Sequence, residues 1–288
     1  MILVTGATGT IGREVVRRIP ADLAVRIMAR HPERVTGAGA EAEIVHGDFS
    51  DPASLAGVLR GVRTVFLVTN PGGDDDEGFI RAARSAGVRQ VVKLSAAAVA
   101  DSRAEDLITR WQRRNEDLLR GSGMEWTLLR PRAFMSNALS WAGSIRSDDV
   151  VRALYGASAN ACVDPRDVAE VAVRALTEDG HADRVHTLTG PEAISAAEQT
   201  AQLAELLRRP LRFEELGPEQ ARTALGARYP ADIVEALLES AERGREGAKA
   251  EVDGTVAGLL GRPAGTFRGW AADHLSAFGN ASRCGGTG

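Results

Sequence analysis

The first dozen residues constrain the fold more than any other part of the chain. An apolar run at residues 2–4 leads directly into a Gly-x-x-Gly-x-x-Gly segment at residues 6–12, and a helical pattern follows at 13–18. Backbone amides at such a helix start point outward, the helix dipole favours an anion, and glycines let a pyrophosphate approach the main chain. Because a strand precedes the glycines and a helix follows them, we predict a dinucleotide-binding turn rather than an ordinary glycine-rich turn. The residues expected to hold the dinucleotide here are Gly6, Thr8, Gly9, Thr10, Ile11 and Gly12.

The end of the next expected strand predicts which dinucleotide is bound. Residues 23–29 form an apolar run, and Arg30 follows it with no acidic residue at the strand end. An Asp or Glu at this position would bind the ribose 2′-hydroxyl of NAD, whereas an Arg favours the 2′-phosphate of NADP. We therefore predict NADPH as the cofactor, with a solvated surface role for Arg30 as the alternative.

Further apolar runs predict the rest of the sheet. They lie at residues 43–49, 63–71, 90–95 and 126–131, and helical patterns separate them. This alternation predicts an α/β fold of the Rossmann type, with a doubly wound parallel sheet that binds ligands at the carboxyl ends of its strands. The additional cofactor-binding residues expected at these strand ends are Asp48, Phe49, Val68, Thr69, Asn70, Ser95 and Pro131.

The character of the chain changes after Pro131, where helical patterns dominate. We expect residues 1–131 to form the NADP-binding core and residues 132–278 to form a smaller, mainly helical substrate lobe. Late strands of the main sheet are expected at 161–163 and 184–189 within this second part. The last residues, 279–288, read as a disordered tail.

Apolar side chains just after Pro131 predict the substrate site. Phe134 and Met135 could stack a flat apolar ligand, and Asn137 could bind its polar group. Packing between lobe and sheet is an equally good interpretation of these residues. Because this stretch is apolar and almost uncharged, it favours a hydrophobic aromatic substrate over a sugar or an acid.

Charge, cysteine content and hydropathy argue against several classes of partner. The net charge of −4 gives no support for a nucleic-acid partner. Cys162 and Cys284 are far apart and lack metal-ligand spacing, which is typical of free thiols in a reducing cytoplasm. The first expected strand starts at Met1, so no signal peptide is expected, and no apolar run reaches transmembrane length. We expect a cytoplasmic protein that does not act at a membrane.

Two groups of charged residues have both a functional and a structural interpretation. Lys93 falls in a buried strand, where it could act near the nicotinamide but more simply pairs with an acid or reaches the strand end. The acidic run at residues 74–77 could bind a metal but more simply opens the helix expected at 77–86. We therefore predict no metal site.

Several blocks of sequence together resemble the NmrA-like proteins, atypical members of the extended short-chain dehydrogenase/reductase superfamily. These blocks lie at residues 5–12, 47–48, 93–95, 126–131, 164–169 and 190–192. The resemblance runs from Met1 to about Phe278. It implies either an NADPH-dependent quinone or ketone reductase, or an NADP-binding sensor that catalyses nothing.

The chain departs from that superfamily at its catalytic pair. The typical reductase protonates a ketone with the Tyr of a Tyr-x-x-x-Lys motif. Here neither Tyr155 nor Tyr229 is followed by a Lys four residues later, and the resemblance aligns the pair with Ile108 and Gln112. The acid–base part of the mechanism is therefore in question, whereas cofactor binding is not.

The favoured prediction is an NADPH-dependent reductase of a quinone or of an aromatic, polyketide-like ketone. Its proton would come from water, the substrate, Ser95 or Tyr155, in descending order of preference. The alternative is a non-catalytic NADP(H)-binding redox sensor with a protein partner. A sugar-nucleotide epimerase would need the missing Tyr-Lys pair.

Overall fold

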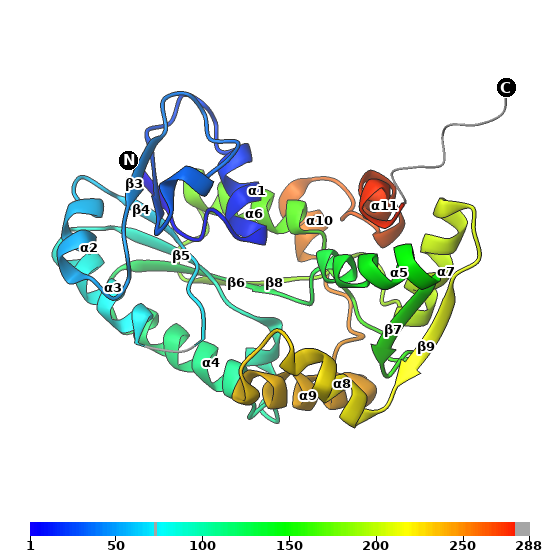
Figure 1. The fold of residues 1–288 in the computed structure, drawn as a ribbon. Helices are drawn as coiled ribbons and strands as arrows, with labels where there is room; N and C mark the ends of the chain where they lie inside the picture. The colour runs from blue at the N-terminus through cyan, green and yellow to red at the C-terminus, as the bar shows by residue number, and fades with distance from the viewer. Residues whose placement is uncertain (72–73, 280–288) are drawn as a thin grey trace, which may run out of the picture. The chain divides into compact units, whose positions relative to one another are not determined.

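The computed structural model describes residues 1–71 and 74–279. Cys284 and all but the first residue of the predicted disordered tail lie outside this part of the chain. The chain forms two compact units (Figure 1). Among the described residues, the first unit contains those within Met1–Pro131, Pro165–Leu188 and Thr255–Arg262, and the second contains Arg132–Asp164, Thr189–Gly254 and 263–279.

A seven-stranded parallel sheet forms the centre of the first unit. Its strands, in spatial order, are β3 (Glu43–His46), β2 (Val25–Ala29), β1 (Ile2–Val4), β4 (Thr64–Leu67), β5 (Gln90–Leu94), β6 (Glu125–Pro131) and β8 (Arg184–Leu188). All adjacent strands pair in parallel, with Leu3 opposite Arg26 on one side and Val65 on the other. The predicted Rossmann-type α/β fold is confirmed, including the late strand expected at 184–189.

The strand order determines where a ligand can enter. The chain builds outward from β1 to β2 and β3, and then continues on the opposite side of β1 with β4. The order of strands reverses between β1 and β4, and such a switch point opens a crevice at the carboxyl ends of the two strands. The glycine-rich turn follows β1 and therefore lies at this crevice.

Helices cover both faces of this sheet (Figure 1). One face carries α1 (Thr10–Arg18), α6 (Pro165–Thr177) and α10 (Thr255–Leu260), and the other carries α2 (Pro52–Val58), α3 (Asp75–Ser85) and α4 (Leu107–Arg120). The core beneath α2–α4 consists of buried aliphatic and aromatic side chains such as Leu3, Leu55 and Phe79. Burial of these side chains supplies the main favourable term for this layer.

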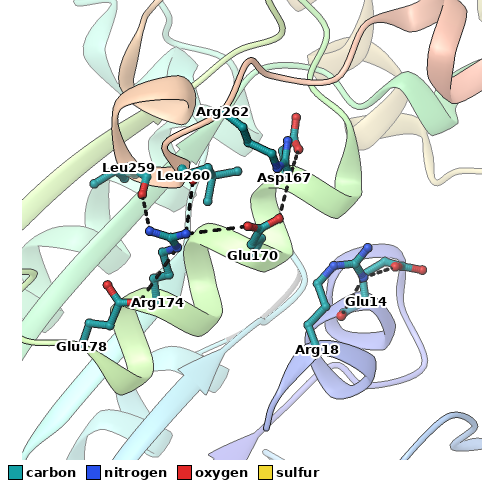
Figure 2. Close-up of polar contacts among 9 residues, drawn as sticks. All are labelled: Glu14, Arg18, Asp167, Glu170, Arg174, Glu178, Leu259, Leu260 and Arg262. Atoms are coloured by element: carbon teal, nitrogen blue, oxygen red, sulfur yellow. Dashed lines mark hydrogen bonds and ion pairs between the residues drawn. The ribbon is translucent and has the colours of Figure 1, made fainter.

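Charged side chains hold α10 on α6 (Figure 2). The guanidinium of Arg174 donates to the carbonyl oxygens of Leu259, at 2.7 Å, and Leu260, at 3.2 Å. These carbonyls end α10, where the helix has no internal donors for them. Arg262, just beyond α10, pairs with the buried Asp167 at 2.9 Å. Residues from late in the sequence are thus fixed against the first unit.

The second unit contains a small parallel sheet and several helices. Its strands are β7 (Val150–Leu154) and β9 (Arg212–Leu216), and its helices are α5 (Ala142–Asp148), α7 (Ala196–Leu207), α8 (Pro218–Gly226), α9 (Ala231–Arg245), α11 (Phe267–Asp273) and α12 (Leu275–Phe278). A buried core that includes Ile145, Leu203 and Trp270 holds these elements together.

One strand prediction is wrong. Residues 161–163 were expected in the main sheet, but the segment around them makes only isolated bridges, between Phe134 and Val163 and between Asn160 and Ile194. The segment is buried within the second unit, so its apolar residues have a packing role that mimics a strand pattern. None of the helices in the described residues is long and apolar enough to span a bilayer.

Candidate functional site

The glycines of the first turn are required by backbone geometry. Gly6 has a φ of +66°, and a Cβ added there would lie 2.8 Å from the Cβ of Val68. A Cβ at Gly12 would lie 2.1 Å from the carbonyl oxygen of Gly6. Any side chain at these two positions would force the turn away from β4 or from α1. The turn therefore keeps its main chain tightly packed, leaving its outer side accessible.

Helix α1 begins at Thr10, within the glycine segment. Its N-cap is Gly9, which offers no side chain to satisfy the first amides of the helix. These amides and the positive end of the helix dipole form an anion site at the crevice between β1 and β4. A pyrophosphate fits this position.

A cavity of about 430 Å³ opens beside the turn, entirely within the first unit. It is lined by Gly6, Ala7, Thr8, Gly9, Met28, Ala29, Arg30, Gly47, Asp48, Phe49, Val68, Asn70, Pro71 and Asp75. Eight predicted cofactor-binding residues are among these, namely Gly6, Thr8, Gly9, Arg30, Asp48, Phe49, Val68 and Asn70. Several of the lining residues are glycine or alanine, which lets a nucleotide approach the main chain.

The other predicted cofactor residues do not line this cavity. They are Thr10, Ile11, Gly12, Thr69, Ser95 and Pro131. Ile11 is buried in α1, and the position of Gly12 is used for packing against Gly6. Conversely, Asp75 lines the cavity although the acidic run was interpreted as a helix start, with metal binding as the less favoured alternative. The sequence signal for Asp75 was the acidic first turn itself, which does not reveal which of its carboxylates faces the ligand.

Arg30 provides the positive charge of the cavity. Its side chain is exposed, and within the described residues it makes no hydrogen bond or ion pair. Two carboxylates lie near it: hydrogen bonds from Ser50 lower the pKa of Asp48, and burial raises the pKa of Asp75. The guanidinium is thus available to a phosphate, and the open helix end, the glycine turn and Arg30 together fit NADPH.

A buried polar network lies behind the cavity. The Lys93 ammonium is 2.5 Å from Asp76, and Thr69 and Asn115 donate to the other oxygen of Asp76 at 2.6 and 2.9 Å. Burial lowers the pKa of Lys93, and the Asp76 carboxylate opposes that shift. The ion-pair interpretation of Lys93 is confirmed. Thr69 turns its hydroxyl toward this network, which explains why it does not line the cavity.

Ser95 belongs to a second buried network. Its hydroxyl donates to the fully buried Glu116 at 2.6 Å, and Arg130 donates to both oxygens of Glu116, at 2.9 and 2.5 Å. The proton of Ser95 is therefore held by a carboxylate that is already paired with a cation. To protonate a substrate, Ser95 would first have to leave this network.

A second cavity, of about 190 Å³, lies entirely within the second unit. Phe134 and Asn137, both predicted to bind substrate, line it together with Trp141. Met135 does not, because its side chain is buried in the core of this unit. Neighbouring residues of the short helix η3 (Met135–Trp141) thus point in different directions.

Two reactive side chains also line the second cavity. Tyr155 has a left-handed backbone with a φ of +53°, and its hydrogen bond with Glu242 raises the pKa of its hydroxyl. Burial raises the pKa of the Cys162 thiol to about 11, although an amide hydrogen bond from Gln199 partly opposes this. Both groups are therefore weaker acids than usual. The described residues contain no group of three or more His, Cys, Asp or Glu side chains placed to hold a metal ion.

Comparison with known proteins agrees with this geometry. A family described as NAD(P)H-binding matches residues 6–179. The chain belongs to this family. A relative from Streptomyces griseus, "(4-alkanoyl-5-oxo-2,5-dihydrofuran-3-yl)methyl phosphate reductase", is 60% identical over 279 residues, covering 96% of this chain and 99% of the relative. The NAD(P)H azoreductase of Xenophilus azovorans is 37% identical and covers 98% of this chain and 100% of the relative.

A solved structure supports the same assignment. The NADPH-dependent quinone oxidoreductase QOR2 of Escherichia coli, complexed with NADPH, superimposes with a TM-score of 0.83 at 25% identity, covering 96% of this chain and 100% of that one. The chain is an NADPH-dependent oxidoreductase, and both the predicted enzyme class and NADPH as cofactor are confirmed. The alternative of a non-catalytic sensor is therefore not retained.

Proposed function

We propose that this reductase acts on a phosphorylated butenolide and reduces the double bond of its ring. The observation that carries the proposal is the 60% identity to the Streptomyces griseus reductase along almost the whole of both chains. The substrate in that enzyme's name is an unsaturated lactone that carries an alkanoyl group and a methyl group esterified to phosphate. This substrate class replaces the aromatic ketone as the leading hypothesis.

The proposed substrate suits a site without a Tyr-x-x-x-Lys pair. NADPH supplies a hydride when bound. One carbon of the ring double bond carries both the lactone carbonyl and the alkanoyl group. When a hydride adds to the other carbon, the electron pair of the double bond moves to the first carbon and is delocalised into its two carbonyl groups. A proton from water then adds to this anion and completes the reduction. Because the substrate itself stabilises this anion, the protein needs no strong acid at the reacting atoms.

We assign separate roles to the two units. In the first, the amides at the start of α1 would hold the pyrophosphate and Arg30 the 2′-phosphate. In the second, Phe134 would pack against the ring and Asn137 would bind a carbonyl oxygen. Ser95 and Tyr155 remain candidate proton donors, ranked below water because each already has a hydrogen bond to a carboxylate.

A quinone is the second candidate substrate. Phe134 and Trp141 line the cavity of the second unit and could stack a flat ring. Hydride addition to a quinone also gives a stabilised anion, so the same site could reduce it without a strong acid.

The test is NADPH oxidation by the purified protein with three substrates in parallel. These are the butenolide phosphate, a naphthoquinone and a hydroxylated aromatic ketone. We expect the butenolide phosphate to give the highest kcat/KM by at least tenfold. A higher kcat/KM with the quinone would favour the second candidate, and one with the aromatic ketone would refute both proposals.

A further inference from the structure

The chain contains only two lysines beside 33 arginines. Lys93 is buried in its ion pair with Asp76 in the first unit. The other, Lys249, lines the cavity of the second unit. An ammonium is a compact charge on a slender stem, whereas a guanidinium is planar and wide, so a lysine fits a confined position more readily than an arginine.

The local structure directs Lys249 into this cavity. Its backbone carbonyl accepts a hydrogen bond from the amide of Ala161 at 2.9 Å, which ties the residue to the cavity wall. A Cβ added to Gly244 would lie 3.2 Å from Cδ of Lys249 and 3.4 Å from Oγ of Ser158. The absence of a side chain at Gly244 thus leaves room for the stem of Lys249 beside Ser158. The Lys249 charge also reaches the thiol of Cys162 and favours its ionised form.

Lys249 contributes a positively charged side chain to the lining of the cavity. Among the described residues that line it, Lys249 is the only charged one, and none is a carboxylate. Ser158 and Gln199 add polar groups to the same wall. The side-chain oxygen of Asn160, also on this wall, is a buried acceptor without a hydrogen-bond partner in the described structure. It needs a donor such as water or a substrate O–H, so it does not itself bind the anion.

We propose that Lys249 binds the phosphate of the substrate and sets the preference for a phosphorylated butenolide. This inference rests on the proposed function for its substrate, but the charge of the cavity supports it independently. A charge-assisted bond to a phosphate in a partly enclosed site corresponds to roughly 10- to 100-fold in affinity. Lys249 is therefore a specificity residue and takes no part in hydride or proton transfer.

The test compares Lys249→Met, Lys249→Arg and the control Arg228→Met on two substrates. Arg228 is an exposed cation of the same unit that does not line the cavity. With the butenolide phosphate, Lys249→Met should lower kcat/KM about 10- to 100-fold, and Lys249→Arg should recover part of it. With the dephosphorylated hydroxymethyl butenolide, Lys249→Met should match the wild type. An equal loss with both substrates would overturn the proposal, because it would indicate a structural role.

A binding measurement separates this inference from the proposed function. Phenyl phosphate is titrated calorimetrically into the wild-type protein and into the two methionine variants. Binding that weakens at least tenfold in Lys249→Met, but not in Arg228→Met, supports the anion site even if no butenolide is reduced. Equal affinity in all three proteins, or no binding to the wild type, refutes it.

Discussion

Arg30 offers the sharpest test of cofactor selection. Its side chain is exposed and makes no ion pair or hydrogen bond within the described residues, so Arg30→Gln removes a positive charge without breaking the fold. Hydrogen bonds to charged groups contribute about 1.5–3 kcal/mol, and exposure to water places Arg30 near the lower figure. A loss of about 1.5 kcal/mol weakens NADPH binding about tenfold. The ionised Asp48 nearby would add repulsion toward the 2′-phosphate.

The assay is calorimetric titration of NADPH and NADH into wild type, Arg30→Gln and Arg34→Gln. Arg34 is a matched control because it is an exposed arginine four residues away that does not line the cavity. Arg30→Gln should weaken NADPH about tenfold and leave NADH almost unchanged, because NADH lacks the 2′-phosphate. Equal loss for both cofactors, or the same loss in Arg34→Gln, would refute the role of Arg30.

Four further predictions follow from the polar contacts. Asp76→Asn should lower the free energy of unfolding in urea by about 3–5 kcal/mol, because it leaves the ammonium of Lys93 buried without its counter-ion; a loss below about 1 kcal/mol would contradict this. Arg174→Met should lower the free energy of unfolding by about 1–2 kcal/mol in the same assay, because the carbonyls that end α10 lose their hydrogen-bond donor. An unchanged urea midpoint would show that water replaces the guanidinium. Burial lowers the pKa of His186 below its ordinary value of 6.5, so on acidification the imidazole takes up a proton in the unfolded chain before it does so in the folded protein. The free energy of unfolding should therefore fall as the pH drops below about 6.5. His186→Gln should flatten that dependence between about pH 7.5 and 5.5, as measured by urea unfolding. Ser95→Ala should retain kcat within a few-fold, and a loss of 100-fold or more would identify Ser95 as the proton donor.

Local sequence patterns predicted the first unit well. The strand, glycine turn and helix at the N-terminus follow from backbone rules that act within a dozen residues. The same rules could not predict which side chains of one short segment face the cavity and which face the core. Asp75 and Asp76 are adjacent, yet one lines the cofactor cavity and the other pairs with Lys93. Successive residues of a helix are rotated by about 100°, so assigning the direction of each carboxylate requires the exact residue at which α3 begins.

The second unit was harder to predict because its contacts are not local. β7 and β9 pair although about 60 residues separate them, and β9 contains three charged residues in five, so β9 does not read as a buried strand. Met135 and Phe134 look equally suited to a ligand in the sequence. Met135 is buried in a core cluster that also contains residues far along the chain, such as Trp270, whereas Phe134 lines the cavity.

The position of the transferred hydride tests the proposed function most directly. The enzyme is supplied with the butenolide phosphate and with NADPH that carries deuterium at its transferable position, and the product is examined by NMR. We predict deuterium on the ring carbon that bears the methyl phosphate group, with the alkanoyl ketone intact. Deuterium on the former ketone carbon would show that the enzyme is a ketone reductase and would contradict the account of a site that works through a substrate-stabilised anion.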